Sequence, residues 1–70
     1  MHLEKYDGKN VRIVTIDGEE FFGYVYYFSY GDENENGQDS IDVEFPGGKI
    51  FSFDESDIRS IEVVSDENGK

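Results

Sequence analysis

The amino-acid sequence predicts a small all-β domain, a five-stranded barrel with a short N-terminal helical turn. Five runs of β-branched or aromatic residues, each long enough for a strand, follow one another along the 70-residue chain. Most of them are separated by short segments rich in glycine, proline or aspartate, which are typical of tight turns. Six phenylalanines and five tyrosines can supply the core, because each buried ring removes roughly 150–250 Å² from water. These observations favour a small barrel over a helical or α/β fold.

The first part of the chain predicts a helical turn followed by a hairpin. Leu3 and Tyr6 are spaced i and i+3, which gives one apolar helical face within residues 2–7. Residues 11–16 are β-branched apart from one arginine and predict the first strand. An Asp-Gly pair at positions 17–18 follows, and it is a strong hairpin signal because both residues tolerate positive φ.

Residues 21–30 predict a long aromatic strand with apolar side chains on both faces, which suits a strongly bent strand. Gly23 lies inside it, where the missing side chain permits a bulge or a sharp bend. A barrel this small cannot bury rings on both faces of one strand. Phe22, Tyr24 and Tyr26 are therefore candidates for covering the N-terminal turn or for binding another protein. Base stacking is the weaker interpretation, because this strand contains no cation.

The second half of the chain predicts a loop, three short strands and a tail. Residues 31–40 contain nothing apolar and predict a solvated loop. Strands are predicted at residues 41–45, 50–53 and 59–64. A tight helical turn at residues 56–58 joins the last two. The predicted domain covers residues 1–64, and residues 65–70 are expected to be a disordered polar tail.

The expected core takes apolar residues from all five strands and from the last turn. Its predicted members are Val11, Ile13, Phe21, Val25, Phe28, Val43, Phe45, Phe51, Ile58 and Ile61. Because a chain of this length buries only about 60% of its unfolded surface, each of these side chains should matter to stability.

The charge and composition of the chain argue against several classes of partner and site. Seventeen acidic residues against six basic ones give a net charge of −11, which repels phosphate backbones and anionic membranes. No apolar run is long enough to cross a bilayer, and the N-terminus lacks the pattern of a signal peptide. The absence of cysteine excludes disulfides and Cys-based zinc sites. A cytoplasmic protein without a nucleic-acid or membrane partner is the expectation.

The order of these motifs resembles the Sm and Sm-like (LSm) family, whose domains are SH3-like barrels. The first Sm motif is similar to a set of five residues here, Gly18, Phe21, Gly23, Val25 and Phe28. The second motif is represented by Ile58 and Ile61, with Phe53 before the turn. The two ends of the chain also resemble a set of small, uncharacterised Sm-like proteins from Gram-positive bacteria and their phages.

The resemblance implies an RNA site that this chain has altered. RNA-binding Sm proteins resemble one another in an asparagine on the third strand and an Arg-Gly pair before the fifth. Here those positions are Asp42 and Asp54-Glu55. Anions replace a cation along the expected path of a phosphate, so RNA binding is not expected.

The resemblance also implies self-assembly. Sm-like proteins form rings by pairing the fourth strand of one subunit with the fifth strand of the next, and unpaired strand edges favour such contacts. The corresponding interface residues here are Ile50, Phe51, Phe53, Ile61, Val63 and Val64. A homo-oligomer is therefore expected.

The acidic loop partly matches a calcium-binding motif. Asp32, Asn34 and Asn36 have the spacing that opens an EF-hand loop, and Asp39 could add a further ligand. The match fails at the twelfth position, where the motif needs glutamate and this chain has Val43. A solvated loop without a metal is the favoured interpretation.

No catalytic constellation is present in the sequence. His2 is the only histidine, there is no cysteine, and no serine has a histidine partner. The sequence therefore predicts a non-enzymatic interaction or scaffold module that needs no cofactor and binds proteins, itself above all. Two alternatives stay open: an RNA-binding protein of the Sm type and an acidic mimic of nucleic acid.

Overall fold

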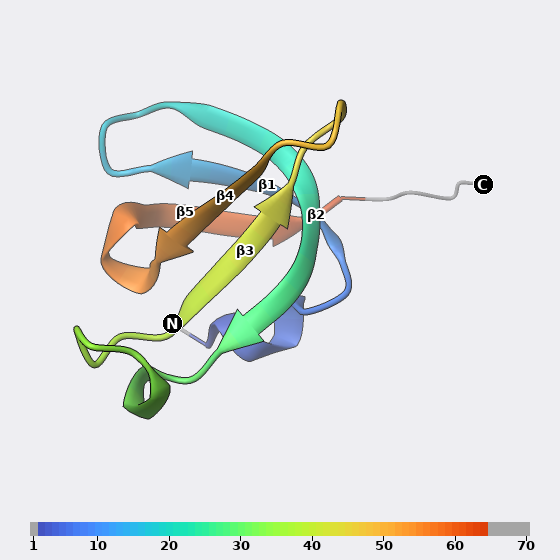
Figure 1. Ribbon diagram of the computed structural model, residues 1–70. Coiled ribbons are helices and arrows are strands. Elements are labelled where there is room, and N and C mark those ends of the chain that lie inside the picture. The colour runs from blue at the N-terminus through green and yellow to red at the C-terminus, as the bar shows by residue number, and fades with distance from the viewer. Residues whose placement is uncertain (1, 65–70) are drawn as a thin grey trace.

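The computed structural model describes residues 2–64 (Figure 1), and the tail expected at residues 65–70 lies outside this range. The described elements are short 3₁₀ turns and five β-strands. In chain order they are η1 (Leu3–Tyr6), β1 (Asn10–Thr15), β2 (Glu20–Ser29), η2 (Gly31–Glu33), β3 (Ser40–Glu44), β4 (Ile50–Asp54), η3 (Glu55–Asp57) and β5 (Ile58–Val63). The all-β prediction is confirmed, and each strand lies within a residue or so of its predicted position.

The strands form one antiparallel sheet with the order β4-β3-β2-β1-β5. Figure 1 shows β2 as a long arc that curls the sheet around its core. The sheet is not closed into a barrel, because β4 and β5 are its two edges and do not pair. The turn η3 does not fold β5 back against β4; it carries the chain across to β1, where β5 pairs instead. The predicted barrel closure is therefore absent from the described strands.

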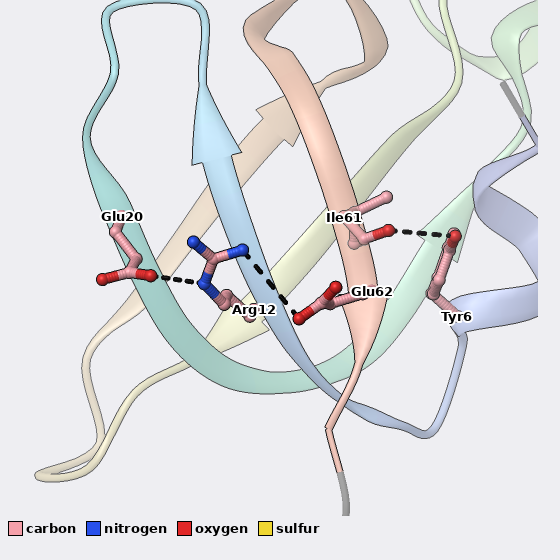
Figure 2. A network of polar contacts seen from close by, with 5 residues as sticks. All are labelled: Tyr6, Arg12, Glu20, Ile61 and Glu62. Carbon is pink, nitrogen blue, oxygen red and sulfur yellow. Dashed lines mark hydrogen bonds and ion pairs between the residues drawn. The ribbon is translucent and has the colours of Figure 1, made fainter.

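The β1–β2 hairpin follows from its sequence. Gly18 has φ +86°, and its N–H donates to the Thr15 carbonyl at 2.9 Å, while the Thr15 hydroxyl accepts from the N–H of Glu19 at 3.2 Å. On the outer face Arg12 forms ion pairs with Glu20 of β2 and Glu62 of β5, so it bridges both neighbouring strands (Figure 2). The hairpin is thus stabilised by a glycine at a positive φ that other residues rarely adopt, and by an ion pair between its two strands.

Gly23 allows β2 and β3 to approach closely, which differs from its expected role at a bulge. A Cβ on Gly23 would lie 2.6 Å from Val43 Cγ1 and 2.9 Å from the Glu44 carbonyl oxygen. The shift in the β2–β3 register occurs farther along, between Val25 and Tyr27. The glycine is therefore needed for packing, and the irregularity that reorients the strand follows it.

The core lies on the concave face of the sheet. Its buried residues are Leu3, Tyr6, Val11, Ile13, Val25, Ile41, Val43, Phe53 and Ile58, and Phe21, Phe28, Phe45 and Ile61 pack against them. The prediction for Phe51 was wrong: its side chain is 50% exposed, whereas that of Phe53 is 6% exposed. Both rings are on the inward pleat of β4, but Phe53 lies 5.6 Å from the Phe21 ring, inside the core.

The N-terminal turn η1 covers one end of the core. Leu3 and Tyr6 are buried, and the Tyr6 hydroxyl donates to the Ile61 carbonyl at 3.2 Å, as Figure 2 shows. The N–H of Gly8 donates to the Val25 carbonyl at 2.7 Å, which fixes the exit of the turn against β2. The predicted helical turn is therefore present, as a 3₁₀ turn that contributes to the core.

Candidate functional site: the sheet edges and the outer face

Both edges of the sheet expose apolar side chains that belong to the inward pleat. Phe51 on β4 pairs with Val43, and Val63 on β5 pairs with Val11. Val43 and Val11 are fully buried, but Phe51 and Val63 are 50% and 52% exposed. The difference arises because the outer sides of β4 and β5 have no neighbouring strand in the sheet. Each edge is therefore an apolar strip beside backbone groups that no strand pairs, although the Ile61 carbonyl of β5 accepts from the Tyr6 hydroxyl and the Asp54 N–H of β4 donates to the Asp57 carboxylate.

The six predicted interface residues fall into three groups. Ile50, Phe51 and Val63 are exposed at the edges. Ile61 and Val64 are half-buried on the β5 side. Phe53 belongs to the core of its own subunit, so it is not available to a partner.

The outer face of β2 carries the three aromatic residues singled out from the sequence. Phe22, Tyr24 and Tyr26 are all exposed, and the hydroxyl of Tyr24 lies near Gly8, just after η1. Tyr27 joins them: after the register shift it pairs with Asp42, the neighbour of the inward-facing Val43. Simple alternation along β2 would place Tyr27 on the inward face together with Val25. The shift in register reverses this, and the residue pattern alone does not reveal the shift. The convex face of β2 is thus a continuous aromatic stripe.

A groove of about 580 Å³ crosses this outer face beside the β3–β4 turn. Its lining comes from β1, β2, the end of β3, the β3–β4 turn and Val64, which follows β5. Among the residues that line it are Phe22, Tyr24, Glu44, Phe45, Pro46 and Val64. Two of the candidate aromatic residues and one candidate interface residue therefore meet in one concave site, which no single sequence motif indicated.

Asp42 and Asp54, two positions singled out by the resemblance to the Sm family, line a second, polar hollow. Asp42 accepts a hydrogen bond from the Ser52 hydroxyl at 2.6 Å, and Asp54 accepts from the Asn36 amide at 2.9 Å. Asp54 also forms a capping box with Asp57 at the start of η3. Glu55 follows, and its N–H donates to the Asp39 carbonyl at 3.0 Å. These residues tie the acidic loop to the β4–η3 connection, which gives them a structural role.

The loop residues that the sequence suggested as calcium ligands also form hydrogen bonds that stabilise the loop. The Asn34 amide donates to the carbonyls of Tyr30 and Gln38 at 3.2 and 2.7 Å, and the Asp39 carboxylate accepts from the N–H of Gly31 at 2.8 Å. Asp32 is exposed. Within residues 2–64 no cluster of three or more His, Asp or Glu side chains is arranged to hold a metal ion. The loop polar groups mainly satisfy its own backbone.

Comparisons with protein-family models, with curated proteins and with solved structures found no match to this chain. No helix in the described part of the chain is long and apolar enough to span a membrane. His2, the one histidine of the sequence, is exposed next to η1. The apolar edges of β4 and β5 and the groove on the outer face are the candidate binding surfaces of the described residues.

Proposed function

We propose that this chain is a non-catalytic, Sm-like interaction module that assembles with copies of itself. In this proposal β4 of one copy pairs with β5 of the next and extends the curved, SH3-like sheet. The observation that carries the proposal is the half-exposed apolar side chain at the inward pleat of each edge, Phe51 on one and Val63 on the other. Edge pairing would bury both side chains and satisfy the edge backbone groups at once.

The two edges match in length and pleat. β4 has five residues and β5 has six, so nearly every residue of β4 finds a partner in a parallel pair, in which the backbone groups of Ser52 that no strand pairs would bond to those of Ile61 and Val63. Strand side chains alternate between the faces, which means that Phe51 can oppose Ile61 or Val63 while the inward faces stay aligned. A slip of one residue would put Phe51 opposite Glu62 and would turn apolar side chains outward. The pattern therefore favours two registers.

Edge pairing of this kind is a head-to-tail contact. Each copy uses a different surface on each side, so the assembly closes into a ring when the rotation between copies allows it and otherwise grows as a filament. A ring leaves no free edge, which removes the aggregation hazard of exposed strand edges.

A charge placed on one edge should disrupt the assembly without unfolding the subunit. We expect Val63→Lys to lower the mass measured by size-exclusion chromatography with light scattering, because pairing would bury an ammonium group. Tyr27→Lys is the control, because Tyr27 has nearly the same exposed fraction (53% against 52%) but lies in the middle of the sheet. Circular dichroism should be unchanged in both. Equal masses for the two variants would contradict edge pairing.

The proposal also includes negligible affinity for uridine-rich RNA. The six basic residues are dispersed along the sequence, and the hollow beside β3 and β4 is lined by Asp42, Asp54 and Glu35. Nucleic-acid affinity depends on cations that replace counterions along the phosphates. Fluorescence anisotropy of a labelled oligo-uridine at about 150 mM salt should show no saturation. Saturable binding with Kd below about 1 µM would instead favour the RNA alternative.

A further inference from the structure

We infer that the groove on the outer face binds a cationic, extended segment of a partner protein, with an arginine or lysine flanked by apolar residues. The inference refines the proposed function, a protein-interaction module, by giving the chemistry of a partner other than a second copy. Apart from Val64, which belongs to both, it uses a different surface, because the groove lies on the outer face of β2 and β3, whereas edge pairing uses the outer sides of β4 and β5.

The groove supplies aromatic faces to a cation. Phe22 and Tyr24 follow each other on the outer pleat of β2, and both are exposed. Gly23 between them lies on the inward pleat, and its backbone is part of the lining of the groove. An ammonium or guanidinium group placed over an aromatic face within about 6 Å is attracted by the ring quadrupole.

A carboxylate lies beside these rings. Glu44 of β3 is the direct cross-strand partner of Tyr24, and among the described residues that line the groove it carries the only charge. One cation could therefore contact a ring and a carboxylate together, a combination that neutral or anionic ligands cannot exploit. The nearest arginine on the outer face, Arg12 opposite Phe22, is paired with Glu20 and Glu62. The charge of Arg12 is therefore paired with carboxylates other than that of Glu44.

The remaining walls suit apolar neighbours of that cation. Phe45, Pro46 and Val64 border the groove with mainly apolar surface, and such pockets accept the anchor residues of extended peptides. The net charge of −11 steers a cationic segment toward the protein and disfavours anionic partners. Shape, ring chemistry and charge therefore indicate the same kind of ligand.

The test uses a fluorescein-labelled nonapeptide of three Arg-Pro-Leu repeats, titrated with the wild-type protein at about 50 mM salt. We expect saturable anisotropy that weakens as salt rises. The same peptide with citrulline in place of arginine keeps the shape and loses the charge, and it should bind about tenfold more weakly. Equal binding of both peptides, or no saturation up to about 1 mM protein, would overturn the inference.

Pairs of matched variants, one inside the groove and one outside it, test whether the peptide binds in the groove. Phe22→Ser should weaken the arginine peptide about tenfold, whereas Tyr27→Ser, on the same strand and equally exposed at 53%, should change it less than about twofold. Glu44→Gln should weaken binding and flatten its salt dependence, whereas Glu19→Gln, in the β1–β2 turn outside the groove, should do neither. Equal effects within either pair would contradict the assignment.

Light scattering on the same samples separates this inference from edge pairing. Phe22→Ser should leave the mass of the wild-type assembly unchanged. A loss of mass in that variant would assign the groove to self-assembly and contradict the inference. A monomeric wild-type protein that still binds the peptide with this variant pattern would refute edge pairing and leave the groove assignment standing.

Discussion

The Ile13→Ala variant is expected to lose most of the stability of the domain. Ile13 is fully buried, and on β1 it lies between Phe21 of β2 and Ile61 of β5. Removing a buried isoleucine side chain to alanine costs about 2–5 kcal/mol, from lost burial and from the cavity left behind. A domain of 70 residues has a free energy of unfolding of about 4–10 kcal/mol in total. The loss is therefore a large share of the whole.

Thermal and urea unfolding followed by circular dichroism measure this effect. Ile16→Ala is the matched control, since it removes the same atoms from a side chain that is 57% exposed; it should change the free energy of unfolding by less than about 0.5 kcal/mol. If Ile13→Ala melted at the wild-type temperature, the core described here would be wrong.

The Gly23→Ala variant is expected to show the second large loss. The added methyl group would clash with Val43 Cγ1 at 2.6 Å and with the Glu44 carbonyl at 2.9 Å. Val43 can rotate only within a filled core, and the Glu44 backbone can move only by disturbing the β2–β3 ladder. Overpacking of this kind costs about 1–3 kcal/mol.

Urea unfolding of Gly23→Ala should give a lower midpoint with an unchanged slope, because the clash lowers stability without altering the surface exposed on unfolding. The backbone conformation itself does not forbid alanine there, since Gly23 is not among the glycines with positive φ. An alanine variant as stable as wild type would mean that β2 and β3 are farther apart than described.

The residue pattern predicted the strands well because each has a local signal. Alternation marks β3, the β-branched run marks β1, and the Asp-Gly pair fixes the turn between β1 and β2. Exposure at the edges was less predictable. Phe51 and Phe53 have the same pleat, and only the positions of the neighbouring strands decide that Phe53 enters the core while Phe51 stays half exposed.

The candidate site depended on features that no short motif encodes. The register shift after Val25 brings Tyr27 to the outer face, and the groove forms only where the bend of β2 meets the β3–β4 turn and Val64. The aromatic residues themselves were identifiable from the sequence, because a small sheet cannot bury rings on both faces. Their arrangement into a groove with Glu44 required the strand pairing.

The central claim, self-assembly through β4 and β5, is tested most directly by the mass of the wild-type protein in solution. Sedimentation velocity at tens of micromolar protein is the measurement, because it also separates closed rings from filaments. We expect one discrete species whose mass is a whole-number multiple of the 8.0 kDa chain. A single species of 8.0 kDa across that concentration range would contradict the claim.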